Sequence, residues 1–117
     1  MRGFGRWVVS LAFLSAGLSM PTPSRALDYP NILGNWCSET SKYTFTREMF
    51  SIFVFATRGE GSFKIIDYRF TSEEVDVGWF NPEAGERHAA FGEFTKDGAT
   101  MFQLARGSAP HKRYERC

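Results

Sequence analysis

Short runs of alternating apolar and polar residues, separated by turn residues, dominate the sequence from residue 27 onward. In "EEVDVGWF", Val75, Val77 and Trp79 alternate with polar or small residues, which is the period of a strand with one buried and one solvated face. Helical spacing is almost absent from this part of the chain. We predict eight strands, over residues 32–38, 42–46, 49–56, 62–70, 73–80, 88–95, 99–105 and 111–117.

The segments between the predicted strands are short and have the composition of hairpin turns. Arg47-Glu48 fits a two-residue turn, Asp97-Gly98 is the strongest hairpin signal, and Gly85 is placed for a positive φ. Because short connections join neighbouring strands, we expect the strands to be sequential and antiparallel. The predicted fold class is therefore all-β: a small antiparallel up-and-down β-barrel, or a strongly curved meander, of about seven to eight strands.

The pattern also indicates which side chains fill the barrel. Apolar residues change parity at Ile65-Ile66, which predicts a β-bulge there. A barrel of eight short strands is narrow enough for its own side chains to fill it, and large rings favour a packed interior. The candidates for that interior are Trp36, Tyr43, Phe45, Tyr68, Phe70, Trp79, Phe91 and Tyr114.

The first 26 residues have the pattern of a secretory signal. Two arginines precede the uncharged apolar run "WVVSLAFLSAGLSM", and "PTPSRA" ends in small residues where a signal peptidase cleaves. The alternative is a membrane anchor, but the run is short for a span of about 20 residues and prolines follow it. We predict a signal over 1–26, a single β-barrel domain over 27–117, a periplasmic or extracellular location, and no stable membrane anchor after cleavage.

Charge and motifs exclude several function classes. Residues 27–117 keep eleven of the fourteen basic residues and all thirteen acidic ones, a net charge of −2, which argues against a nucleic-acid binder. His88 and His111 lie far apart without metal-ligand spacing, and neither a GxSxG motif nor a phosphate-binding glycine loop is present. Glu73 and Glu74 are typical of a solvated strand end. We therefore predict no enzyme, no catalytic residue, no metal and no cofactor.

Two cysteines are present, Cys37 and Cys117. In an exported protein they are expected to form a disulfide, and a closed loop of about 80 residues contributes roughly 4 kcal/mol in the chain-entropy model. Two free thiols, or pairing between chains, are the alternatives. Because the cysteines lie on the first and the last predicted strand, an intramolecular bond would lock the seam of a closed barrel.

Strand alternation extends this prediction to Trp36 and Arg116. If Cys37 lies opposite Cys117, residue 38 pairs with residue 116, and Tyr114 and Arg116 share the face of Trp36. We predict that the Arg116 guanidinium lies over the Trp36 indole and closes one end of the barrel. The alternative is a solvated terminal arginine.

Gly34-x-Trp36 on the first strand and Arg116 on the last resemble the lipocalin and wider calycin pattern, in which such a tryptophan packs under such an arginine. The chain is also similar in layout to small exported bacterial proteins that begin "GxWC…YTF" and end in "RC". In size and strand count it resembles periplasmic lysozyme-inhibitor barrels. The lipocalin resemblance implies a carrier of a small apolar ligand inside the barrel.

An outward aromatic strip is the remaining candidate site. Phe53, Phe55 and Phe80 are expected to point outward and to form a surface for a protein partner, unless loops or a second copy cover them. We predict an exported non-catalytic binding or inhibitor module with an unknown protein partner; the alternative is a lipocalin-like carrier.

The orientation of Glu93 stays open at the sequence level. It shares the parity of Phe91, so it either points inward and needs a partner such as Arg47 or Arg113, or leaves Phe94 to point inward while it stays in water.

Overall fold

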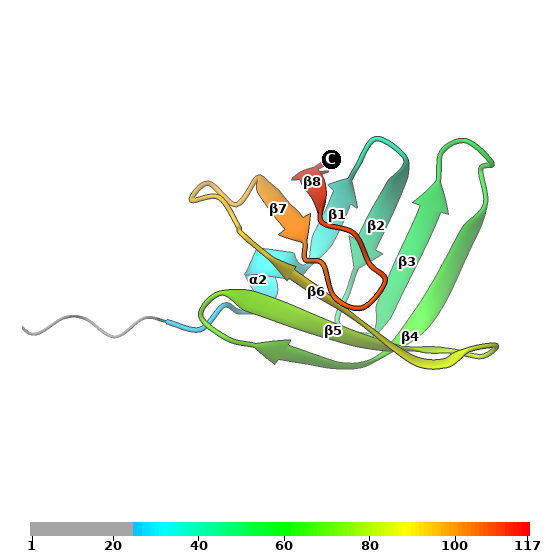
Figure 1. Ribbon diagram of the computed structural model, residues 1–117, viewed down its shortest axis with the longest axis horizontal. Helices are drawn as coiled ribbons and strands as arrows, with labels where there is room; N and C mark the ends of the chain where they lie inside the picture. Colours follow the sequence, from blue (N-terminus) through cyan, green and yellow to red (C-terminus); the bar gives the residue numbers. More distant parts are fainter. Residues whose placement is uncertain (1–24) are drawn as a thin grey trace, which may run out of the picture.

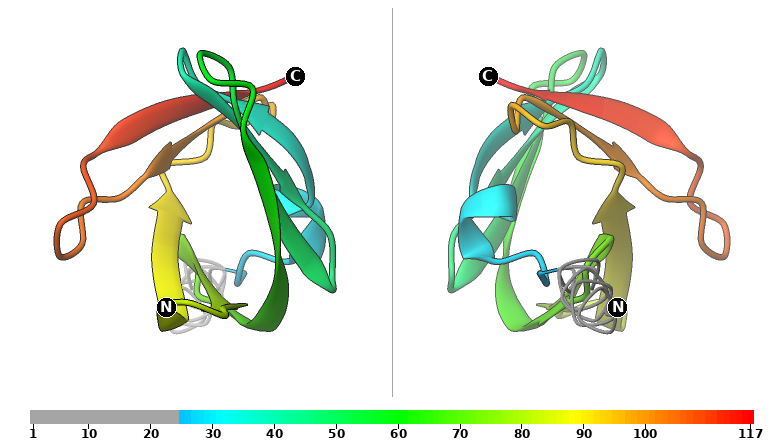
Figure 2. Two further views of the ribbon diagram at one scale, coloured as in Figure 1. Left: turned by 90° about the vertical axis from the view of Figure 1, so that its right-hand side faces the viewer. Right: turned by 90° about the vertical axis from the view of Figure 1, so that its left-hand side faces the viewer.

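The computed structural model describes residues 25–117, and it shows eight strands in one closed antiparallel barrel, ordered β1 to β8 as in the chain (Figure 1). Seen end-on, the strands curl round into a ring (Figure 2). The strands are β1 (Gly34–Cys37), β2 (Ser41–Phe45), β3 (Met49–Val54), β4 (Glu60–Phe70), β5 (Glu74–Asn81), β6 (Gly85–Gly92), β7 (Thr100–Gln103) and β8 (Lys112–Arg116). The predicted all-β barrel is confirmed. The predicted secretory signal falls, apart from Arg25 and Ala26, outside the described residues.

The predicted turns and the bulge are also present. The N–H of Thr46 donates to the carbonyl of Met49 (2.9 Å) across the two-residue turn. Gly85 and Gly98 have φ angles of 85° and 73°. The β4–β5 register shifts between Ile65 and Asp67, and the residue between them is exposed.

A short helix, α2 (Tyr29–Ile32), precedes β1 and was not predicted. Asp28 caps it by accepting from the N–H of Tyr29 (2.7 Å), and the Asn31 side chain accepts from the N–H of Asp28 (2.8 Å). The first strand therefore starts at Gly34 and not at residue 32. Ile32 is fully buried and its carbonyl accepts from the Trp36 indole N–H (2.8 Å), so α2 covers one end of the barrel interior.

The barrel interior is occupied by a single cluster of side chains. Tyr43 stacks on Tyr114 with 4.7 Å between ring centroids, and Phe45 stacks on Phe50 at 4.9 Å. The fully buried members include Trp36, Phe45, Phe50, Phe91, Met101 and Tyr114. Of the eight aromatic residues predicted for the interior, four are buried in this cluster, and Tyr43, Tyr68, Phe70 and Trp79 are partly buried and pack against it.

The barrel closes through a short seam between β1 and β8. Only Trp36↔Arg116 and Cys37↔Glu115 pair across it, and a disulfide joins Cys37 to Cys117 with 5.7 Å between Cα atoms. The predicted disulfide is confirmed, but the predicted register, with Cys37 opposite Cys117, is wrong by two residues. Side-chain direction repeats every two residues, so a shift of two leaves every face unchanged.

Within residues 25–117, no helix has the length and apolar character needed to cross a bilayer.

Candidate binding site

The site begins where β6 ends. Glu93 follows Gly92 with a φ of 55°, a left-handed conformation that non-glycine residues seldom adopt. This residue interrupts the alternation, so both Phe91 and Phe94 turn toward the interior, where Phe94 packs edge-on against Trp36 with 6.3 Å between ring centroids. The Glu93 side chain is left exposed, as in the second of the two orientations that the sequence allowed.

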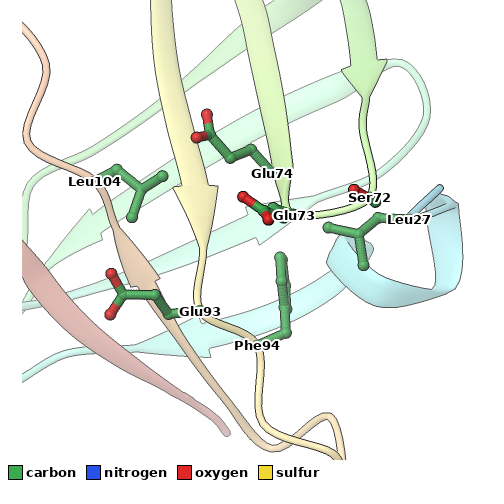
Figure 3. Close-up of a pocket in the computed structure, with 7 residues that line it drawn as sticks. All are labelled: Leu27, Ser72, Glu73, Glu74, Glu93, Phe94 and Leu104. Carbon is green, nitrogen blue, oxygen red and sulfur yellow. The ribbon is translucent and has the colours of Figure 1, made fainter. Parts of the chain in front are cut away.

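A pocket of about 390 Å³ lies where β5 begins and where β6 and β7 end (Figure 3). We call it the acidic pocket; its lining residues are Leu27, Ser72, Glu73, Glu74, Glu93, Phe94 and Leu104. Three of these side chains are apolar and three are carboxylates. The acidic pocket therefore combines an apolar surface with a negative rim.

Four distant chain segments meet there through backbone contacts. The N–H of Leu27 donates to the carbonyl of Thr71 (2.7 Å), and the N–H of Leu104 donates to the carbonyl of Ala90 (2.8 Å). Gly92 permits this approach, because a Cβ at that position would lie 3.0 Å from the Glu73 carbonyl oxygen and 3.1 Å from Leu104 Cδ1. A side chain there would push the neighbouring segments apart.

The carboxylates of the acidic pocket differ in their partners. Glu74 accepts two hydrogen bonds from Arg106 (2.8 and 2.9 Å). Glu93 pairs with His111 (3.2 Å), not with Arg47 or Arg113. Glu73 is exposed, and within residues 25–117 its carboxylate makes no ion pair. The acidic pocket thus presents the Glu73 carboxylate, without an ion-pair partner, beside apolar side chains.

The sequence offered little signal for this pocket. The sequence around Glu73 and Glu74 is typical of a solvated strand end. Nothing in the local sequence pattern connects these residues to Leu27, Phe94 or Leu104. The left-handed backbone at Glu93 is the feature that brings Phe94 inward, and it has no sequence marker at a glutamate.

The predicted aromatic surface divides into two places. Phe53 and Phe55 are neighbours, with 5.9 Å between ring centroids, and Phe55 is 40% exposed. Phe80 is also exposed, but it lies opposite Lys64 of β4, whereas Phe53 lies opposite Glu60. The structure therefore does not bring the three rings together into one strip.

The predicted contact between Arg116 and Trp36 is present, with the guanidinium carbon 4.1 Å from the indole centroid. The guanidinium also donates to the carbonyls of Leu33, Pro30 (3.1 Å) and Gly98 (3.2 Å). Partial burial lowers the pKa of Arg116, although an arginine keeps its charge at any physiological pH. The pair joins β8 to the α2–β1 segment and to the β6–β7 connection at this end of the barrel.

The histidines belong to separate clusters. His88 contacts Glu86 (2.6 Å) and Asp76 (3.6 Å) on the outer face, while His111 contacts Glu93 and stacks on Phe102 with 4.7 Å between centroids. In the described part of the chain, no group of three or more His, Cys, Asp or Glu side chains is placed to hold a metal ion.

When compared with protein-family models, with curated proteins and with solved structures, the chain matches none of them.

Proposed function

We propose that this protein is an exported, non-catalytic binding or inhibitor module. Its partner binds at the acidic pocket and not inside the barrel. The observation that carries this proposal is the occupied interior. Trp36, Phe45, Phe91 and Tyr114 are each at most 1% exposed and belong to one packed cluster. A carrier needs an interior space that its ligand can fill, so the filled core favours a binding surface outside.

The acidic pocket favours a cationic group on the partner. Glu73 supplies an unpaired carboxylate, and Phe94, Leu27 and Leu104 supply apolar surface beside it. A lysine or arginine side chain has this combination, because its aliphatic stem packs on apolar surface while its charged end stays near an acid. We therefore expect a protein partner with an exposed basic side chain.

Affinity capture with the purified, disulfide-bonded protein tests this proposal. Glu73→Gln removes the unpaired charge and keeps the side-chain shape, and Glu83→Gln makes the same change in the exposed β5–β6 turn, away from the pocket. A partner captured by the wild type and by Glu83→Gln, but lost with Glu73→Gln, is the expected result.

Two results would contradict the proposal. Equal binding by Glu73→Gln and the wild type would move the partner site away from the acidic pocket. A stoichiometric apolar molecule, extracted by organic solvent from the purified protein, would favour the carrier alternative instead.

A further inference from the structure

A row of neutral polar side chains crosses the outer face of the first four strands. Asn35, Thr44, Ser51 and Ser62 lie directly opposite one another on β1, β2, β3 and β4. We call these four residues the hydroxyl row. Neighbouring strands are about 4.8 Å apart, so the row offers hydrogen-bonding groups at a spacing comparable with the width of a sugar ring.

The hydroxyl row keeps hydrogen-bonding capacity for a ligand. Thr44 Oγ1 donates to Asn35 Oδ1 (2.8 Å), and the hydroxyls of Ser51 and Ser62 are 2.9 Å apart. A hydroxyl has one donor and two acceptor sites, and an amide has two donors. One serine proton, the Asn35 NH₂ group and several oxygen lone pairs therefore stay available on the solvent side.

The adjacent row supplies an aromatic ring and two opposite charges. Phe53 lies between Lys42 on β2 and Glu60 on β4. Phe53 is half-buried, and its ring is 5.8 Å from the Arg58 guanidinium carbon. Thr44, Ser51 and Ser62 of the hydroxyl row, together with the adjacent row, line an open trough of about 400 Å³. One row lining the trough supplies neutral hydroxyls, and the other supplies a phenyl ring with Lys42 and Glu60, whose charges cancel.

These features select one ligand class. β2 and β3 each pair with a strand on both sides, so the trough has no free strand edge for an extended peptide. A single ring offers too little apolar area for a helix face. A saccharide has an apolar C–H face that packs on a ring and neutral hydroxyls that both donate and accept.

We infer that the outer face of β2–β4 binds a neutral saccharide. Its C–H face packs on Phe53, and its hydroxyls bond to Thr44, Ser51 and Ser62. Lys42 and Glu60 lie at the same side of the trough as Phe53 and bond to hydroxyls at that edge. This site lies on other strands than the acidic pocket and does not depend on it.

Titrations with maltotriose, cellotriose and tri-N-acetylchitotriose, followed by backbone amide NMR of the purified protein, test the inference. At least one trisaccharide should give saturable shifts at the amides of Thr44, Ser51, Phe53 and Ser62, with a Kd of about 1 mM or tighter. Phe53→Ala should weaken this binding about tenfold. Phe80→Ala, which removes an exposed ring outside the trough, should leave the Kd unchanged.

Thr44→Val is the second variant, because it removes a hydroxyl while keeping the β-branched shape that suits a strand. It should weaken binding at least about threefold, the effect of a net hydrogen bond near the low end of its range. The inference is overturned if none of the three sugars gives saturable shifts at these amides. It is equally overturned if both Phe53→Ala and Thr44→Val, with native-like spectra, bind as tightly as the wild type.

Discussion

The guanidinium of Arg116 lies over the indole of Trp36, 4.1 Å from the ring centroid, and the two residues face each other across the β1–β8 seam. The same guanidinium donates to carbonyls of the α2–β1 segment and to the carbonyl of Gly98 in the β6–β7 connection. One side chain therefore fastens three parts of the chain at the end of the barrel.

Replacing Arg116 with lysine should lower the free energy of unfolding by about 1–2 kcal/mol. A lysine keeps the charge but loses the planar fork that serves several carbonyls and stacks on the indole. Chemical denaturation followed by tryptophan fluorescence measures the change. Arg113→Lys is the matched control, because the Arg113–Glu115 ion pair is exposed and should contribute less than about 0.5 kcal/mol. Equal loss in both variants would contradict the prediction.

Removing the disulfide should lower the free energy of unfolding more than Arg116→Lys does. The bond spans 80 residues, for which the chain-entropy model gives about 4 kcal/mol. The β1–β8 ladder has only two residue pairs, so the Cys37→Ser, Cys117→Ser variant should unfold at a much lower denaturant concentration. Coincident unfolding curves for the variant and the oxidised wild type would show that the seam holds without the bond.

Gly34→Ala should destabilise the protein more than Gly98→Ala. Both glycines have positive φ, at 119° and 73°, so both substitutions carry a backbone penalty. At Gly34 the new Cβ would also lie 2.6 Å from Arg116 Nη1, whereas at Gly98 no atom lies within 4 Å. We expect a loss of about 2–4 kcal/mol for Gly34→Ala and about 1–2 kcal/mol for Gly98→Ala. Thermal unfolding of the two variants, measured side by side, tests the order.

The barrel should lose stability at alkaline pH. Burial raises the pKa of Tyr114 and of Tyr68 above the ordinary value of 10.0, and for Tyr68 the neighbouring Tyr29 raises it further. Above pH 10 the unfolded chain therefore releases these protons while the folded chain keeps them, so the free energy of unfolding falls as pH rises.

The expected slope is roughly 1 kcal/mol per pH unit for each phenol. Tyr114→Phe and Tyr68→Phe should each reduce the slope between pH 10 and the raised pKa, whatever they do to stability at pH 7. Denaturant midpoints measured across this range test the prediction, and an unchanged slope in both variants would refute it.

The sequence predicted side-chain positions correctly wherever the alternation of faces along a strand is sufficient to place them. The positions of Trp36, Phe45 and Tyr114 follow from alternation alone, and the pairing of Cys37 with Cys117 follows from their being the only two cysteines. The register at the seam was missed by two residues, because Cys117 lies diagonally across from Cys37 and its N–H donates to Asn35. A shift of two preserves the faces, and for that reason the contact of Arg116 with Trp36 was still predicted correctly.

The features that the sequence did not predict depend on single backbone angles or on the alignment of strands that are far apart in the chain. Helix α2 is only four residues long, too short to show a helical period, although Asp28 and Asn31 carry its cap. The φ of Glu93 cannot be read from a glutamate, yet it sets the direction of Phe94. The alignment of the hydroxyl row depends on the registers of three successive strand pairs, and a shift of one residue in any of them would break the row. The lipocalin resemblance stays a prediction.

The 80-residue separation of the two cysteines also dictates an order of events during synthesis. β1 emerges first and can pair with β2, but its other edge has no partner until β8 has been made. Until β8 is in place, the outer edge of β1, which carries Cys37, is open to other chains. Until the last strand of the ring has joined the first, this small barrel therefore keeps an unpaired edge, which the finished structure removes.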